Sequence, residues 1–286
     1  MIILSRNEKK VKVNFIERFK MSILQTAKKP ASRAPIMTIT GDAGMGKTSL
    51  AATFPNPVFI RGEDGIQSIS KENRPDAFPV LTEVDQLWEQ LLALRNETHQ
   101  YKTIVIDSVT AIDTLFTNYI VDTDIKKPKT IAQALGGYGA GFQALSSLHG
   151  RIRRICGDIN DKGINVIFIA HSETENIELP DEDAYTRYGI RINKKSLSHY
   201  IDNVDLVGFI KLETITRGDG DRKKAISDGT RQIICYATPA NISKNRYGIE
   251  EKIIIEKNKN PFVGLMPIAG LKQTKQQATI EDKANG

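Results

Sequence analysis

A glycine-rich segment of eight residues, Gly41 to Thr48, most constrains what this chain can fold into. It reads GDAGMGKT and matches the pattern G-x-x-x-x-G-K-[ST]. An apolar run, Pro35 to Thr40, precedes it, and a helix-like stretch begins at Lys47. Glycines let the backbone turn tightly and present its N–H groups, and the first turn of a helix adds partial positive charge. The segment therefore predicts a phosphate-binding loop, or P-loop, between a buried strand and a helix.

The same loop predicts which residues hold a nucleotide. Lys47 should reach the β- and γ-phosphates of ATP, and the Thr48 hydroxyl should bind Mg²⁺. The expected nucleotide contacts are Gly41, Asp42, Ala43, Gly44, Met45, Gly46, Lys47, Thr48 and Ser49. The apolar run Thr103 to Asp107 ends in a carboxylate, and Asp107 should hold the same Mg²⁺ through its water shell. ATP and Mg²⁺ are thus the expected cofactors; the simpler interpretation is a structural turn and a strand-ending aspartate.

Short apolar runs alternate with helix-length patterns along most of the chain. The runs span 36–39, 58–60, 104–106, 166–170 and 206–210. Their β-branched residues and nearly continuous apolarity favour strands buried on both faces, which is typical of a parallel sheet covered by helices. Apolar residues at helical spacing over 84–94 and 142–159 predict two covering helices, with Thr82 as the cap of the first. Two β-rich runs, 232–236 and 252–256, predict further antiparallel strands.

Basic residues are concentrated at the N-terminal end. Residues 1–33 contain nine Lys or Arg and two Glu, which sums to +7, whereas the whole chain of 286 residues carries +6. We expect a basic arm over 1–33, one ATPase domain over 34–256, and a polar, flexible tail over 257–286. The arm would either attract nucleic acid through counterion release or form a solvated surface extension.

Composition excludes several classes of protein. The two cysteines, Cys156 and Cys235, are far apart, so the sequence predicts neither a disulfide framework nor a zinc site. No apolar run approaches the roughly 20 residues that cross a bilayer. Charged residues follow Met1 to Leu4 too closely for a signal peptide. We expect a soluble, cytoplasmic protein with no membrane partner.

Activation of an attacking water needs a carboxylate other than Asp107. Ser108 follows Asp107, so the Asp-Glu pair of many ATPases is absent. An acidic pair follows the second apolar run, and Glu63 is the candidate for polarising the water, with Asp64 as the alternative and ordinary surface acids as the simpler interpretation. The fourth run leads into His171 and Ser172, and either side chain is placed to sense the γ-phosphate. A lone histidine at a strand end more often has no such role.

Four segments taken together, Gly41 to Thr48, Phe59 to Gly65, Ile104 to Thr110 and Val166 to Glu173, resemble the RecA-like ATPases in order and spacing. Within that superfamily they look most like the phage-encoded ATP-binding proteins of the Sak group, which are RecA-like single-strand annealing proteins. The resemblance covers about 34–256. It implies an α/β fold with a RecA-like P-loop NTPase core, a mostly parallel sheet flanked by helices, and C-terminal antiparallel strands.

The resemblance also implies roles for single residues. Glu63 stands at the catalytic glutamate position, and His171 stands where RecA-like proteins carry a polar γ-phosphate sensor, commonly Gln. Lys244 and Arg246 resemble the Lys-x-Arg element that hexameric RecA-like helicases and RadA proteins insert into a neighbouring subunit's ATP site. Such a finger contributes roughly 10³–10⁵ in rate. Hydrolysis would then require a ring or filament of copies; the alternative is a basic surface turn.

Two loops are implied as the DNA-binding elements, at about 122–141 and 173–199. Basic groups interleaved with aromatic rings suit single strands, because bases stack on rings while cations meet phosphates. The first half of the second loop is acidic, which argues against contact along its whole length. The candidate DNA-binding residues are Lys126, Lys127, Lys129, Arg187, Tyr188, Arg191, Lys194 and Lys195.

The leading hypothesis is an ATP-dependent single-stranded DNA-binding protein of phage recombination that promotes annealing or strand exchange. Its partners would be single-stranded DNA, further copies of itself, and a phage single-strand binding protein or a helicase. ATP turnover would depend on Mg²⁺, oligomerisation and DNA. The sequence leaves two alternatives open: a nucleotide-switched helicase loader or interaction module, and a P-loop kinase whose lid would use Arg187 and Arg191.

Overall fold

The computed structural model describes residues 23–181, 183–217 and 224–272. Its internal contacts divide the chain into two units, 1–32 and 33–286. In the described part of the first unit, a short 3₁₀ helix, η1, spans Ile23–Thr26. Most of the expected basic arm lies outside the described residues. All further elements belong to the second unit.

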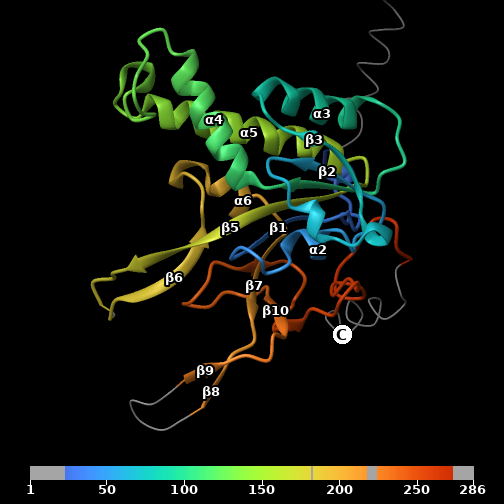
Figure 1. Ribbon diagram of the computed structural model, residues 1–286. Coiled ribbons are helices and arrows are strands. Elements are labelled where there is room, and N and C mark those ends of the chain that lie inside the picture. Colours follow the sequence, from blue (N-terminus) through green and yellow to red (C-terminus); the bar gives the residue numbers. More distant parts are fainter. Residues whose placement is uncertain (1–22, 182, 218–223, 273–286) are drawn as a thin grey trace, which may run out of the picture. The chain divides into compact units, whose positions relative to one another are not determined.

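A ten-stranded sheet forms the centre of the second unit, in the order β12-β10-β7-β1-β5-β4-β2-β3, with β6 paired to β5 and β11 paired to β7 (Figure 1). The six strands from β7 to β3 in this order run parallel. The strands of the sheet are β1 (Ile36–Gly41), β2 (Pro57–Arg61), β3 (Asp76–Val80), β4 (Thr103–Asp107), β5 (Asn165–Ile177), β6 (Tyr185–Ile190), β7 (Leu206–Leu212), β10 (Arg231–Ile234), β11 (Lys244–Asn245) and β12 (Ile253–Ile254). Strands β8 (Ile215–Arg217) and β9 (Lys224–Ile226) form a separate hairpin.

The five apolar runs expected as strands are β1, β2, β4, β5 and β7, and the predicted α/β fold with antiparallel C-terminal strands is confirmed. Every residue of β1 and of β4 is buried, which explains why these strands show no polar alternation. Strand β3 was not predicted because it lies at the edge of the sheet, has no buried residue, and contains Pro79.

Helices cover both faces of the sheet. On one face pack α3 (Val84–Asn96), α4 (Val109–Thr123), α5 (Ala140–Asn160) and the short α6 (Ser198–Ile201), around one apolar cluster (Figure 1). On the other face lies α2 (Lys47–Ala51), in a second cluster. Short 3₁₀ turns connect these elements: η2 (Ile66–Ser68), η3 (Lys71–Asn73), η4 (Ala134–Gly136) and η5 (Lys194–Ser196).

The first expected helix, α3, buries its predicted apolar residues, including Trp88. The expectation of Thr82 as its cap needs correction. The helix is capped by Glu83, and the Gln86 side-chain oxygen accepts hydrogen bonds from the backbone N–H groups of both Thr82 and Glu83. Two donors that precede the first turn are thereby satisfied.

The boundary expected at residue 256 also needs correction. Phe262, Met266 and Ile268 are buried in the second apolar cluster, where Phe262 lies against Phe54. The apolar side chains in this stretch are spaced too widely to show a period, so its polar composition suggested a tail. Packed structure therefore extends at least to Ile268.

None of the helices in the described ranges is both long and apolar enough to cross a membrane.

Candidate functional site

The parallel pairing of the strands brings polar and charged residues together at the carboxyl ends of the strands. Gly41, the last residue of β1, pairs with His171 of β5 on one side and with Ile210 of β7 on the other. Asp107, the last residue of β4, pairs with Arg61, two residues before Glu63. The carboxyl ends of parallel strands form a common crevice where ligands bind. The predicted P-loop, Asp107, Glu63 and His171 therefore lie around one crevice.

The P-loop fold depends on its glycines at two points. Gly46 has a left-handed backbone conformation, with φ of 87°, at the residue that precedes α2. At Gly41, a Cβ atom would lie 2.6 Å from the carbonyl oxygen of Ile210, so a side chain would push β1 and β7 apart. Both positions thus require glycine, one for its conformational freedom and the other for the close approach of two strands.

Lys47 is folded back onto its own loop. Its Nζ donates hydrogen bonds to the carbonyl oxygens of Gly41 and Asp42, each at 2.8 Å, and the residue is only 6 % exposed. Burial lowers the pKa of Lys47, and the neighbouring carboxylates of Asp107, Glu63 and Asp42 oppose this change. An ammonium group held by two neutral carbonyls can exchange them for phosphate oxygens, which are stronger acceptors.

Thr48 and Asp107 form the oxygen pair predicted to hold Mg²⁺. The Thr48 hydroxyl donates to Asp107 Oδ2 at 2.7 Å, and Asp107 is 3 % exposed. Burial raises the pKa of Asp107 to about 6; the hydrogen bond from Thr48 opposes the rise and the charge of Glu63 adds to it. A Cβ atom on Gly65 would lie 3.2 Å from the Thr48 hydroxyl oxygen, so the missing side chain leaves room beside the pair.

These donors fit Mg²⁺. The ion prefers oxygen ligands, usually takes one or two carboxylates, and completes its shell with water and substrate phosphates. The described residues contain no cluster of three or more His, Cys, Asp or Glu side chains that could hold a metal ion by themselves. A divalent cation beside Asp107 would also offset the cost of burying its carboxylate.

The two acids proposed for water activation have different partners in the structure. His171 Nε2 lies 2.9 Å from Glu63 Oε1, and this hydrogen bond lowers the pKa of Glu63 to about 2, although partial burial works against it. Asp64 instead pairs with Arg61 at 2.8 Å. Glu63 thus faces the lysine and aspartate of the crevice, whereas the charge of Asp64 is already matched.

Both candidates for sensing the γ-phosphate also touch the crevice. The backbone N–H of His171 donates to the Thr110 hydroxyl at 3.0 Å, which fixes the point where β5 leaves the core. The neighbouring Ser172 hydroxyl donates to Asp42 Oδ1 in the P-loop. One strand therefore connects the P-loop, through Ser172, with the carboxylate of Glu63, through His171.

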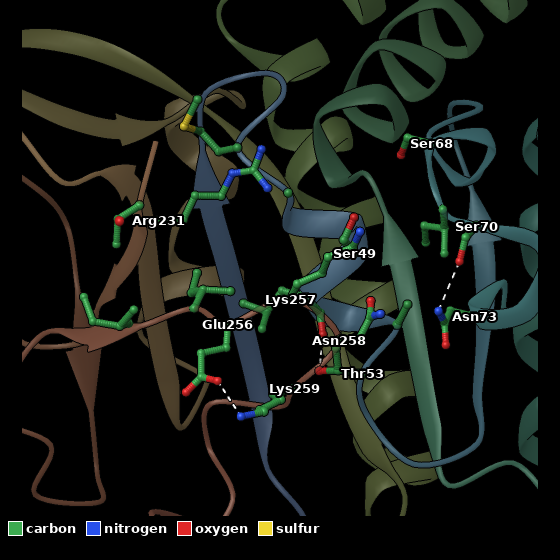
Figure 2. A pocket seen from close by; sticks show the side chains of 18 of the residues that line it. Ser49, Thr53, Ser68, Ser70, Asn73, Arg231, Glu256, Lys257, Asn258 and Lys259 are labelled. Carbon is green, nitrogen blue, oxygen red and sulfur yellow. Dashed lines mark hydrogen bonds and ion pairs between the residues drawn. The ribbon is translucent and has the colours of Figure 1, made fainter. Parts of the chain in front are cut away.

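A cavity of about 600 Å³ opens on the outer side of α2, beside Gly46 and Ser49 of the P-loop (Figure 2). Its other walls were not predicted. They come from η2 and η3, from the start of β10, and from the segment after β12. The polar and charged side chains around it are Ser49, Thr53, Ser68, Ser70, Asn73, Thr230, Arg231, Glu256, Lys257, Asn258 and Lys259. These segments are far apart in the sequence and meet only because of the strand order of the sheet. For this reason no local sequence motif predicts the cavity.

Lys244 and Arg246 lie far from this crevice. Lys244 pairs with Val207 near the start of β7, and Val207 also pairs with Thr38 of β1, from which β1 runs roughly 10 Å further to Gly41. Arg246 binds Asp205 Oδ1 at 3.0 Å, the same atom that Arg33 binds. Lys244 Nζ donates to the carbonyls of Ile201 and Asp202. Neither side chain can reach the P-loop of its own chain.

The candidate DNA-binding residues fall into two groups. Lys126, Lys127 and Lys129 are exposed between α4 and α5, and Lys194 and Lys195 are exposed in η5. Lys195 Nζ would lie 3.2 Å from a Cβ atom on Gly139, so the two predicted loops meet there.

Two residues of the second loop, Arg187 and Tyr188, have partners within the chain, and a third, Arg191, lies near the P-loop. Arg187 pairs with Glu175 at 2.7 Å, and the Tyr188 ring stacks on Phe209 with centroids 4.9 Å apart. Arg191 is exposed, and its charge contributes to lowering the pKa of Lys47. Arg191 thus lies within electrostatic reach of the P-loop.

Together these features define a class of protein. A buried lysine on a glycine-rich loop follows β1, and a buried aspartate ends β4, two places away in the sheet. With the strand order β7-β1-β5-β4-β2 and helices on both faces, the molecule has the fold of a RecA-like P-loop NTPase.

A match to a family model agrees with a P-loop domain. A family model described as an AAA domain matches residues 33–247, about three quarters of the chain, and the chain therefore belongs to this AAA domain family. Among solved structures, the crystal structure of the RadB recombinase is similar at 12% identity and a TM-score of 0.45, over 79% of this chain and 90% of that chain. A comparison with curated proteins finds no match.

The raised pKa of Asp107 predicts a pH-dependent gain in stability for Asp107→Asn. Above pH 6 the folded protein carries the cost of a buried carboxylate, whereas below the ordinary value of 3.8 the carboxyl is neutral in both folded and unfolded states. Without nucleotide or metal, the variant should exceed wild type by about 1–3 kcal/mol at pH 8, and the gain should vanish between pH 6 and pH 4. Urea denaturation measures both. Asp122→Asn, which removes an exposed carboxylate, is the control; equal stability of Asp107→Asn and wild type at pH 8 would contradict the prediction.

Proposed function

We propose that this chain is a Mg²⁺-dependent ATPase of the Sak group that binds single-stranded DNA and promotes annealing or strand exchange in phage recombination, in the host cytoplasm. The observation that supports it most is the crevice in which Glu63, oriented by His171, faces Lys47 and the Thr48–Asp107 pair. A positioned carboxylate beside a P-loop serves hydrolysis, because it can orient a water for attack on the γ-phosphate.

In this proposal each side chain of the crevice has one task. The backbone of Gly41 to Ser49 surrounds the phosphates, and Lys47 leaves its two carbonyl partners to bind the β- and γ-phosphates. Thr48 and Asp107 hold Mg²⁺, which when bound neutralises charge on the phosphates and fixes their orientation. Glu63, ionised at neutral pH, accepts a hydrogen bond from the attacking water. The nucleoside extends into the 600 Å³ cavity beyond Gly46.

Completion of the site by a second copy is part of the proposal. Lys244 and Arg246 lie at the opposite edge of the sheet from the P-loop, so they can act on a nucleotide only in a neighbouring subunit. A ring or filament with head-to-tail contacts brings the two edges together. Arg246 would then exchange Asp205 for the γ-phosphate of the neighbour.

Single-stranded DNA is proposed to contact the two loops that meet at Lys195. The exposed ammonium groups of Lys126, Lys127, Lys129, Lys194 and Lys195 suit a phosphate backbone. Arg187 and Tyr188 would first have to leave Glu175 and Phe209. The basic segment 1–33 would add attraction that does not depend on sequence. A phage single-strand binding protein or a helicase would be a further partner, and a helicase-loading role remains the alternative.

The kinase alternative receives less support from the geometry. A kinase lid would need several arginines free to surround an acceptor, but Arg187 is paired with Glu175. Phosphate transfer to an added nucleoside monophosphate, in place of release to water, would favour the kinase.

Replacement of Glu63 by Gln should stop turnover without preventing binding. Loss of a positioned general base costs about 10²–10⁴ in rate. We expect ATP hydrolysis by Glu63→Gln to fall at least about 100-fold while ATP affinity, measured by calorimetry, stays at the wild-type value. The neighbouring Asp64→Asn, which removes a carboxylate already paired with Arg61, should hydrolyse ATP at nearly the wild-type rate. Equal loss in both variants would exclude a specific role for Glu63.

Two inactive variants should restore each other if Arg246 acts between copies. Lys47→Ala lacks the P-loop lysine and Arg246→Ala lacks the finger, so in a co-expressed equal mixture about one quarter of head-to-tail interfaces contain both groups. ATP hydrolysis by the mixture should therefore rise to about a quarter of wild type, whereas each variant alone is inactive. Arg33→Ala, which removes the other partner of the same Asp205 oxygen, should hydrolyse ATP normally. A mixture as inactive as its components would contradict action in trans.

Replacement of Lys126, Lys127 and Lys129 by Ala should weaken binding to single-stranded DNA and flatten its salt dependence. Each phosphate contact contributes roughly 0.7 to the slope of log affinity against log salt, so three contacts correspond to a decrease of about 2. Fluorescence anisotropy with a labelled oligonucleotide across a salt series measures the slope. A triple variant of Lys102, Lys162 and Lys272, exposed elsewhere, is the charge-matched control. A wild-type slope in the loop variant would remove these lysines from the DNA interface, and no binding by wild type at low salt would exclude the DNA-binding function.

A further inference from the structure

One arginine of the same chain lies over the P-loop, although no motif marks it. Arg231 begins β10 and pairs with Leu212 at the end of β7. Its Nη2 lies 3.4 Å from the carbonyl oxygen of Gly44. Its Nη1 lies 3.3 Å from the position that a Cβ atom on Gly46 would occupy, so the guanidinium occupies space that exists because residue 46 is a glycine.

This contact is weak for an arginine. The guanidinium has five N–H donors, and the Gly44 carbonyl is a neutral acceptor at the long end of the hydrogen-bond range. Within the described residues no carboxylate pairs with Arg231, and the residue is exposed. An exposed, uncompensated guanidinium directed at a phosphate-binding loop has most of its donors available for an anion.

The charge around the loop favours a second cation. Lys47 is surrounded by the carboxylates of Asp42, Glu63 and Asp107, and a nucleotide brings further negative charge. Arg231 also lines the 600 Å³ cavity, together with Gly46 and Ser49. It therefore stands where a nucleotide held by the loop would pass from its phosphates to its nucleoside (Figure 2).

We propose that Arg231 binds the α- and β-phosphates of the nucleotide in its own chain. The inference rests on the proposed nucleotide function, and it adds a contact that needs no neighbouring subunit. Arg231 thereby differs from Arg246, which would act on the γ-phosphate of another copy. The planar guanidinium can donate two parallel hydrogen bonds to one phosphate, a geometry that lysine lacks.

The experiment compares nucleotide affinities of Arg231→Gln, Arg231→Lys and Arg154→Gln. Gln retains a donor for the Gly44 carbonyl but loses the charge, Lys retains the charge, and Arg154 is an exposed arginine on α5 that serves as the matched control. Isothermal titration with ATP and with ADP gives the dissociation constants, and thermal unfolding without nucleotide reports on the fold.

Arg231→Gln should weaken ATP and ADP by the same factor of about ten, which is the value of one charge-assisted contact. Arg231→Lys should lie between Gln and wild type, Arg154→Gln should match wild type, and melting without nucleotide should be unchanged. Wild-type affinity in Arg231→Gln would overturn the proposal, as would a loss confined to ATP, which would place the arginine on the γ-phosphate. Absence of ATP binding by wild type would instead overturn the proposed function on which the inference rests.

Discussion

The parallel pairing of β1 between β5 and β7 is the constraint on which the site depends. It sets Gly41 opposite His171 on one side and Ile210 on the other, and β5 in turn aligns Asp107 through β4. A shift of one residue along a strand would exchange inward and outward side chains. Because both apolar clusters bury the faces of these strands, such a shift would expose the core. Core packing and site geometry are thus set by the same register.

The surroundings of two carboxylates in one crevice shift their pKa values in opposite directions. Asp107 is almost fully buried, and burial raises its pKa, whereas Glu63 is 41 % exposed on its side chain and receives a hydrogen bond from His171 that lowers its pKa. In the proposed function, these two carboxylates would have different tasks. A deeply buried carboxylate suits a permanent place beside a cation, and an ionised, accessible one suits contact with water.

The sequence predicted those parts of the site that form a local pattern. The P-loop and the strand ending in Asp107 each combine a short motif with flanking apolar runs, so their strand and helix context was readable. The contact between Glu63 and His171, 108 residues apart, depends on strand order, although their positions after apolar runs and the resemblance had both assigned them to the site. Arg231 and the cavity walls were missed because they belong to an edge strand and to connections without periodicity. Phe262 was missed for the same reason.

Strand β5 extends beyond the core of the sheet and links the crevice to the β5–β6 hairpin. Its first six residues are buried in the core, and from Ser172 onward it pairs with β6. His171 stands at the transition, in contact with Glu63, and the strand continues without a break for roughly 20 Å to Ile177. The β5–β6 hairpin is hydrogen-bonded along its length, so a change in the direction of β5 at His171 would move the whole hairpin. The displacement would be larger at the far end of the hairpin than at the crevice.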